Sequence, residues 1–369
     1  MLQTAIIFFI ILSILIFVHE FGHYIVARLF GVHVEEFGFG LPPRLWGKKI
    51  KGTIYSLNWL PIGGFVRLAG EDADETDIKS VKADNSKKKI DTYFWAKSKT
   101  ARSLILLAGV FMNTLLAVGI TTVLLTRGVI EPTGVVRVEQ VTPGSPAEDV
   151  GVLVNDRISS VTSTDEKGET KVVIVTVPSD VITFMNEKKG KTVSITLMRA
   201  GQEIILTTTP RANPPEGQGP LGVTITDLEK HVYSWREAPV KAVKINAQRV
   251  WQMLTGLGSV IGRLVTGGKI AEGEVAGPIG IAQVTGEAVK YGFDAVLEFM
   301  SILSLNLALL NVLPFPALDG GRLAFVVLEK MGRKARPQLE RTIHQIGMLF
   351  LLGLMALISL QDILRIFHR

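Results

Sequence analysis

The first thirty residues constrain this chain most, because an uncharged apolar run leads directly into three ionisable side chains. Residues 5–18 read AIIFFIILSILIFV, and His19, Glu20 and His23 follow at once. A helix over residues 4–30 is long enough to cross a bilayer, whose hydrocarbon core is about 30 Å thick. Ionisable groups inside such a helix are costly and are usually kept for a function. The sequence therefore predicts a polar site inside a membrane helix.

The composition supports several membrane spans and limits the ligands that the chain can offer a metal. Hydrophobic residues make up 47% of the 369 residues, and there is no cysteine, which excludes disulfides and thiolate ligands. Any metal must then be held by histidine and carboxylate. A cleavable signal peptide is the alternative for the N-terminus, but MLQT carries no positive charge and no A-x-A-like site follows the apolar run.

Four apolar segments are predicted to cross the membrane, at residues 4–30, 102–126, 299–316 and 346–367. The third is short and ends in the proline-broken stretch NVLPFPALDGG. Irregular backbone at membrane depth is tolerated where protein shields it or where it lines a polar cavity. The predicted fold class is a polytopic α-helical membrane protein with about four transmembrane helices.

Basic residues gather in the two loops that join the first span to the second and the third to the fourth. They are Arg44, Lys48, Lys49, Lys51, Arg67, Lys79, Lys82, Lys87, Lys88, Lys89, Lys97 and Lys99, then Arg322, Lys330, Arg333, Lys334, Arg336 and Arg341. By the positive-inside rule both loops are cytoplasmic, so both termini and residues 127–298 face outward from a cell membrane. The net charge of +6 then reports topology, and no nucleic-acid partner is predicted.

Residues 127–225 are predicted to form a β-rich extracytoplasmic domain. VVRVEQV alternates as a strand, TPGSPAEDVG supplies a turn and a short helix, and VSITLMRAGQEIILTTT forms a hairpin around Ala200 and Gly201. Residues 226–298 follow as an amphipathic region, in which 235–266 has helical spacing. That helix either lies at the membrane interface or is an ordinary surface helix.

The stretch TIYSLNWLPIGGFVRLAG is predicted to be a strand, a P-I-G-G turn and a second strand. It is too apolar for a solvated hairpin, so we expect residues 53–67 to rest in or against the membrane near the first helix. The alternative is a small core hairpin of a cytoplasmic subdomain. A strand edge here could clamp an extended peptide by β-addition. The candidate substrate contacts in it are Asn58, Trp59, Leu60, Gly63 and Gly64.

The spacing H-E-x-x-H predicts a zinc site. Residues four apart lie on one face of a helix, so His19 and His23 can bind one ion while Glu20 takes a proton from the attacking water. A helix rises about 21 Å from Ala5 to His19, which places the ion inside the membrane but nearer the cytoplasm. The alternative, two histidines satisfied in a core, does not explain three ionisable residues in a membrane helix.

Zinc in a catalytic site takes three protein ligands, and Asp319 in LPFPALDGG is the candidate for the third. Pro314 and Pro316 break the third span next to it and free backbone groups. Asn311 can donate to a peptide carbonyl or to a developing oxyanion. The alternative for Asp319-Gly320 is an ordinary turn after a proline.

Four motifs occur in order: H-E-x-x-H at 19–23, G-F-G at 38–40, G-x-x-x-N at 109–113 and N-x-x-P-x-P-x-L-D-G at 311–320. Over nearly its whole length the chain resembles the site-2 protease family, the intramembrane zinc metalloproteases of the RseP/RasP type. The resemblance implies zinc held by His19, His23 and Asp319, with Glu20 as the general base. It also implies a membrane-associated β-loop at residues 53–67.

The same resemblance implies that Asn113 and Asn311 help to hold substrate, with Gly38 and Gly40 as further candidates. Val110 stands where many relatives have proline, which puts the local helix geometry in question.

The outer domain resembles a single PDZ domain of the bacterial, permuted kind. PGSPAEDVGVLVNDRISSV carries the pattern, with Asn155 in place of the usual glycine. GPLGVTI would supply the carboxylate loop and the closing strand, so Leu221, Gly222 and Val223 are the candidate peptide groove. The alternative is a size filter against bulky ectodomains.

The predicted function is zinc-dependent cleavage of transmembrane segments of single-pass membrane proteins. An anti-sigma factor and a remnant signal peptide are the substrates that the family implies. An inactive PDZ-bearing scaffold is the alternative, against which the intact metal motif argues. A transporter would need inverted internal repeats, which the sequence lacks.

Overall fold

The computed structural model describes residues 2–71, 73, 78, 81, 90–164, 169–268, 277–333 and 337–367. The chain divides into two compact units, one formed by Met1–Thr126 with Ser234–Arg369 and the other by Arg127–Tyr233. Part of the basic cluster used for the topology prediction lies outside the described residues, namely Lys79, Lys82, Lys87, Lys88, Lys89, Lys334 and Arg336.

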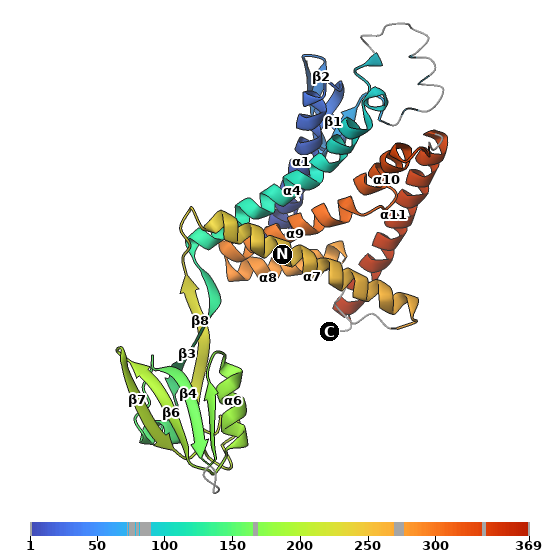
Figure 1. Ribbon diagram of the computed structural model, residues 1–369. Helices are drawn as coiled ribbons and strands as arrows, with labels where there is room; N and C mark the ends of the chain where they lie inside the picture. The colour runs from blue at the N-terminus through green and yellow to red at the C-terminus, as the bar shows by residue number, and fades with distance from the viewer. Residues whose placement is uncertain are drawn as a thin grey trace. The chain divides into compact units, whose positions relative to one another are not determined.

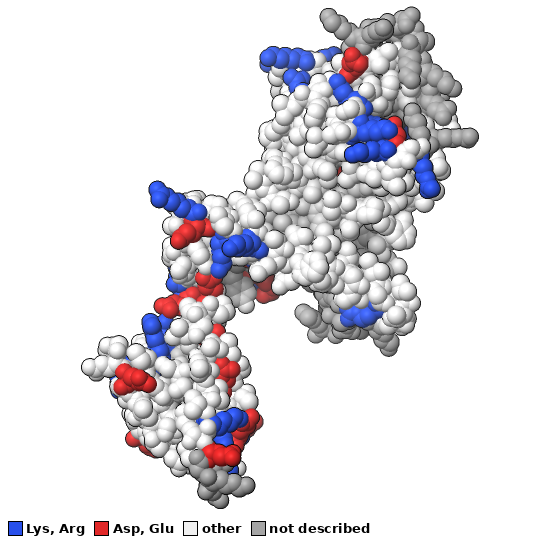
Figure 2. Space-filling model, in the orientation of Figure 1, with Lys and Arg blue, Asp and Glu red and all other residues white. Residues whose placement is uncertain are grey.

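Among its described residues, the first unit has four helices that are long and apolar enough to cross a membrane (Figure 1). They are α1 (Leu2–Leu29), α4 (Lys99–Arg127), α9 (Phe293–Val312) and α11 (Pro337–Phe367). All four coincide with predicted spans, although α9 and α11 begin earlier than expected. Large apolar side chains on α11, among them Leu349 and Phe350, are exposed, as expected for a helix surrounded by lipid. On the face shown in Figure 2, a broad uncharged surface of this unit lies between groups of charged side chains.

Further elements of the first unit connect and brace these helices. They are η1 (Phe94–Ala96), α7 (Ala238–Val265), α8 (Pro278–Tyr291) and α10 (Asp319–Lys330). Helix α7 occupies most of the segment whose apolar spacing predicted a helix. Asn246 on α7 donates to Thr121 Oγ1 on α4 at 3.1 Å, and that hydroxyl lies 3.0 Å from Ser301 Oγ on α9. A buried polar contact thus joins three helices.

Helices α1 and α4 pack closely because one residue at their crossing has no side chain. A Cβ atom at Gly22 would lie 2.4 Å from the carbonyl oxygen of Ala108, which is shorter than any ordinary contact. Ile105 and Leu106 of α4 and Ala27 of α1 are buried together nearby. Helix α4 continues without interruption through Val110, the position that departs from the expected motif.

Two long strands form a sheet beside α1, and their pairing corrects the predicted hairpin. Strand β1 (Val34–Ile50) pairs with β2 (Thr53–Leu68), and the turn between them is Lys51-Gly52, both with positive φ. Two consecutive positive φ angles are what a tight two-residue hairpin requires. The predicted hairpin within residues 53–67 is therefore wrong, because these residues pair with β1 and not with each other. The P-I-G-G stretch lies inside β2.

The register shifts of this sheet show how β2 is arranged. Gly38 of β1 has two partners, Ser56 and Phe65, and its neighbours likewise pair once with residues 54–57 and once with residues 64–67. The two halves of β2 therefore flank one segment of β1 instead of pairing with each other. A Cβ at Gly38 would lie 2.5 Å from the Phe65 ring, so glycine is required for this packing.

The second unit, Arg127–Tyr233, is a six-stranded sheet in its described part, with two short helices. Its elements are β3 (Val129–Val141), α5 (Pro146–Asp149), β4 (Arg157–Thr164), β5 (Thr170–Ile174), α6 (Pro178–Glu187), β6 (Val193–Arg199), β7 (Gln202–Thr208) and β8 (Val223–His231). The order β7-β6-β4-β3-β8 places β8 at an edge, and β5 pairs with β4. The predicted β6–β7 hairpin is confirmed, with positive φ at Ala200 and Gly201 in its turn.

The core of the second unit lies between the sheet and α6. Val136, Val161 and Leu197 are fully buried together with Phe184 of α6. Asn155, which replaces a glycine of the expected pattern, has a φ of 72°, a conformation that asparagine tolerates better than most residues. The carboxylate of the adjacent Asp156 is buried and pairs with Arg199.

Candidate metal centre

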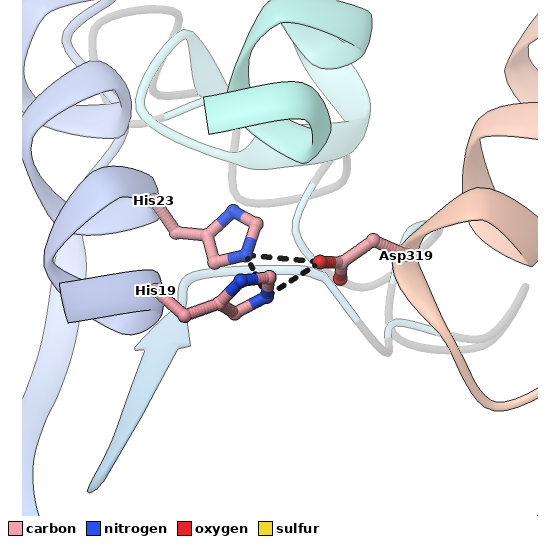
Figure 3. Close-up of side chains that lie close together, drawn as sticks. All are labelled: His19, His23 and Asp319. Atoms are coloured by element: carbon pink, nitrogen blue, oxygen red, sulfur yellow. Dashed lines mark hydrogen bonds and ion pairs between the residues drawn. The ribbon is translucent and has the colours of Figure 1, made fainter. Parts of the chain in front are cut away.

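Three side chains from two distant parts of the first unit converge on one point (Figure 3). Nε2 of His19 lies 2.9 Å from Oδ2 of Asp319, and Nε2 of His23 lies 3.1 Å from the same oxygen. The two histidine nitrogens are 3.2 Å apart. Both histidines are buried, and Asp319 is partly exposed.

The spacing of these three atoms fits a zinc ion. A tetrahedral ion with bonds of about 2.0–2.2 Å has ligand atoms about 3.3–3.6 Å apart, slightly more than the separations of 2.9, 3.1 and 3.2 Å found here. Two imidazoles and one carboxylate are also a ligand set that catalytic zinc sites use. Three ligands on one side leave a fourth position for water or substrate.

Helical spacing on α1 and a break in the chain before α10 bring the ligands together. His19 and His23 are one turn apart on α1, so both rings point the same way. Helix α9 ends at Val312, and Asp319 is the first residue of α10, after the two prolines. A carboxylate in the first turn of a helix is stabilised by the helix dipole.

The segment before Asp319 is held firmly by its neighbours. The backbone N–H of Ala317 donates to Nδ1 of His344 on α11 at 2.9 Å. A Cβ at Gly320 would lie 2.1 Å from the Leu313 carbonyl oxygen, and one at Gly321 would lie 2.3 Å from that of Phe315. The D-G-G sequence is therefore required for the chain to fold back on itself beside the ligand.

Helix α4 approaches the histidines at Gly109. A Cβ there would lie 2.5 Å from Nε2 of His23 and 2.7 Å from Nε2 of His19. One turn to either side, α4 contacts the other nitrogen of each ring. Nδ1 of His23 lies 2.8 Å from the Ile105 carbonyl oxygen, and Nδ1 of His19 lies 3.3 Å from Nδ2 of Asn113.

Glu20 projects toward the sheet. Its Oε2 accepts a hydrogen bond of 3.0 Å from the backbone N–H of Val66 in β2. This contact places the edge segment 64–67 of the sheet beside the residue that follows the first metal ligand.

The predicted substrate-contact residues of the sheet differ in their surroundings, because some are buried and others are exposed. Asn58 is buried and donates to the carbonyl oxygens of Gly40 and Phe39, at 3.0 and 3.3 Å, so it holds the sheet together. Trp59 and Leu60 are exposed. Gly63 packs against Ile16 of α1, and Gly64 against the Gly38 carbonyl oxygen.

Among the other predicted contacts, Gly40 has a φ of 80° and packs on the Leu60 carbonyl oxygen. Asn311 is buried in the last turn of α9. In the second unit, Leu221 is buried, Gly222 has a φ of 77°, and Val223 begins the edge strand β8.

Sequence reasoning missed several residues that hold the site. The Ile105 carbonyl contacts His23, and His344 contacts the segment before Asp319. Ser13 Oγ donates to the Pro61 carbonyl oxygen of the sheet at 2.8 Å. A polar residue such as Ser13 in an apolar helix is a signal that could have been followed. A backbone carbonyl leaves no trace in the sequence.

Comparison with known proteins agrees with this geometry. The profile of peptidase family M50 matches residues 7–354. A relative from Clostridium perfringens, named as a zinc metalloprotease, is 32% identical over 95% of this chain and 96% of its own length. One from Agrobacterium fabrum with the same kind of name is 31% identical over 96% and 94%. The protease Eep of Enterococcus faecalis is 27% identical over 99% of this chain and its full length.

The chain therefore belongs to peptidase family M50, the site-2 protease family. It is a zinc metalloprotease with four helices suited to a membrane and a separate β-rich unit.

Proposed function

We propose that the protein is an intramembrane endopeptidase that cleaves transmembrane segments of single-pass membrane proteins. The observation that carries this proposal is the triad of His19, His23 and Asp319, in which both histidines lie on an apolar helix. In the proposed mechanism these three residues hold zinc, and Glu20 is the general base. Zinc, when bound, polarises the scissile carbonyl and makes the attacking water more acidic.

The position of Glu20 supports its role. It follows His19 directly, and its carboxylate lies on the side of α1 that faces the sheet edge at Val66. A carboxylate here can take the proton of the attacking water and pass it to the leaving amine. Neither proton transfer requires another titratable group.

Substrate binding is proposed to use the β1–β2 sheet. A helix in lipid satisfies all its own amides, so a substrate must unwind before cleavage. Residues 64–67 pair with β1 on one side and turn the Val66 N–H toward Glu20. An unwound substrate added along this edge would regain backbone hydrogen bonds beside the metal.

The topology follows the positive-inside rule. With both basic loops in the cytoplasm, the triad lies near the cytoplasmic side of a cell membrane, and the second unit is extracytoplasmic. Water then has a short path to the site. The lipid bilayer and single-pass substrates are the partners proposed.

The second unit is proposed to be a PDZ domain. Its edge strand β8 lies next to α6 in contact, and Leu221 to Val223 precede and begin that strand. An edge strand beside a helix is suited to bind an extended peptide. The alternative role, a size filter, needs the same unit but no peptide contact.

The test compares wild type with Glu20→Gln in the purified full-length protein. We expect Glu20→Gln to bind zinc with unchanged affinity and to cleave a reconstituted single-span substrate at no more than about one-hundredth of the wild-type rate. His19→Ala should lose both zinc binding and cleavage. Cleavage by Glu20→Gln at the wild-type rate would refute the proposed mechanism.

A further inference from the structure

Asn113 is a fully buried amide in the middle of an apolar helix, and its surroundings define a narrow role. Its exposed fraction is 0%. Polar side chains at such a position are costly unless they are hydrogen-bonded. Nδ2 lies 3.3 Å from Nδ1 of His19, whereas Oδ1 has no hydrogen-bond partner among the described residues.

The alignment of α4 with α1 shows why an amide stands here. Ile105, Gly109 and Asn113 are spaced four apart, so they form one stripe along α4. The glycine lies against the two metal-binding nitrogens, and the residues one turn away reach the two Nδ1 atoms. For His23 the Ile105 carbonyl is an acceptor, so Nδ1 carries the proton and Nε2 is left free for a metal.

To bind zinc through Nε2, His19 must likewise carry its proton on Nδ1. With Nδ2 facing Nδ1, the ring nitrogen accepts, and neutral His19 carries its proton on Nε2, the atom that faces Asp319 and His23. A metal takes Nε2 only without that proton. The two ends of a carboxamide have the same shape, so a half turn of the amide puts Oδ1 on Nδ1. That turn also gives the unpartnered oxygen a donor.

We propose that Asn113 is a positioning residue that accepts the Nδ1 proton of His19 through Oδ1, fixing the tautomer and ring orientation needed to bind zinc. This inference rests on the proposed function, and it replaces the expectation that Asn113 holds substrate. The Ile105 carbonyl does the same for His23. One helix thus supplies an acceptor to each of the two histidines.

The test uses two substitutions that show whether the side chain at position 113 acts as a hydrogen-bond acceptor or as a donor. Asn113→Asp keeps an acceptor of similar size but loses the donor, and Asn113→Leu loses both. Asn246→Leu is the matched control, because Asn246 is also a buried amide bonded to α4, at Thr121 and not at the triad. Zinc dissociation constants are measured by chelator competition on the purified full chain, and cobalt absorption spectra report the ligand geometry.

We expect Asn113→Leu to weaken zinc binding about 10–100-fold and to change the cobalt spectrum, as loss of an outer partner of a metal-bound histidine does. Asn113→Asp should bind zinc at least as tightly as wild type, and Asn246→Leu should be unchanged. Unchanged zinc affinity in Asn113→Leu, with only a raised KM, would overturn the proposal in favour of substrate contact. Equal weakening in Asn113→Asp and Asn113→Leu would overturn it too.

The same measurements separate failure of this inference from failure of the proposed function. If wild type binds zinc no better than His19→Ala, the proposed metal site itself is wrong. If wild type binds zinc and His19→Ala does not, the results for the Asn113 variants bear on the positioning role alone.

Discussion

The carboxylate of Asp319 contacts both metal-site histidines through one oxygen, Oδ2. It begins α10 directly after a proline-broken segment, so its position is set by the backbone and not by a long flexible side chain. Aspartate has one methylene fewer than glutamate, and the Leu313 carbonyl packs directly against the next residue. At Asp319 a substitution therefore changes the ligand, and the closely packed backbone leaves little room to restore the contact with the histidines.

Asp319→Asn retains the shape of the side chain but removes its charge. We expect zinc affinity to fall by more than about 100-fold, beyond the loss typical of an outer partner. Chelator competition measures this, with Asp294→Asn at the start of α9 as a control for a carboxylate outside the triad. Unchanged affinity in Asp319→Asn would remove this residue from the ligand set.

In the second unit, the buried Asp156 pairs with Arg199 through two bonds of 2.7 Å. Arg199→Leu leaves a buried carboxylate without its cation. We expect it to destabilise this unit by about 2–3 kcal/mol, because the loss of one partner exposes the desolvation cost of the other. Hydrogen exchange of β4 and β6 in the full-length protein measures the change. Lys171→Leu, which breaks an exposed pair with Glu187, should have little effect.

The same pair predicts a pH dependence. Burial tends to raise the pKa of Asp156, but the Arg199 guanidinium and the Leu153 N–H hold that pKa below its usual range. A carboxyl with a depressed folded pKa contributes stability above its unfolded pKa, about 3.9, and loses it as the pH falls through the folded value. Protection of β4 and β6 should thus decrease below about pH 4 in wild type. An increase in protection over that range would contradict this assignment.

At the scale of elements, the approach of α4 to α1 depends on glycine at two points. Gly22 admits the Ala108 carbonyl, and Gly109 admits the two imidazoles. The G-x-x-x-N motif was visible in the sequence, but its purpose was not, because the contact joins residues far apart in the chain.

Gly109→Ala tests this packing. The added Cβ would lie 2.5 Å from Nε2 of His23, so we expect zinc affinity to fall at least about tenfold. Gly119→Ala on the same helix is the matched control, since a Cβ there has nothing within 4 Å. Equal zinc affinity in the two variants would show that α4 does not press on the histidines.

The β1–β2 sheet is only partly predictable from the sequence. Alternation and the P-I-G-G sequence correctly indicated β-structure around residue 60, but not its partner. Strand pairing is set by the turn at Lys51-Gly52 and by close packing at Gly38, and neither is expressed in the periodicity of residues 53–67.

At the scale of the whole molecule, the metal site belongs to one unit only. All three candidate ligands and Glu20 lie in Met1–Thr126 and Ser234–Arg369, whereas Arg127–Tyr233 has its own core. Because the second unit has its own core, we expect the first unit to keep its metal site without it.

Replacement of residues 127–233 by a flexible linker should therefore leave zinc affinity unchanged. We expect the shortened protein still to cleave a substrate that has only a short outer segment. A gain in cleavage of substrates with bulky outer domains would favour the size filter, and a raised KM for short substrates would favour peptide binding. Loss of zinc binding would show that the two units do not fold independently.

Sequence alone determined what depends on neighbours along the chain. The four spans follow from local hydropathy, the pairing of His19 with His23 from helical spacing, and the break before Asp319 from two prolines. The tertiary structure decided what depends on contacts between residues about 80 to 300 positions apart. Those contacts are the convergence of Asp319 on the histidines, the close approach at Gly109, and the contacts of α4 with Nδ1 of each ring. Backbone carbonyls and interhelical distances leave no pattern in a sequence, because they arise only when distant segments pack together.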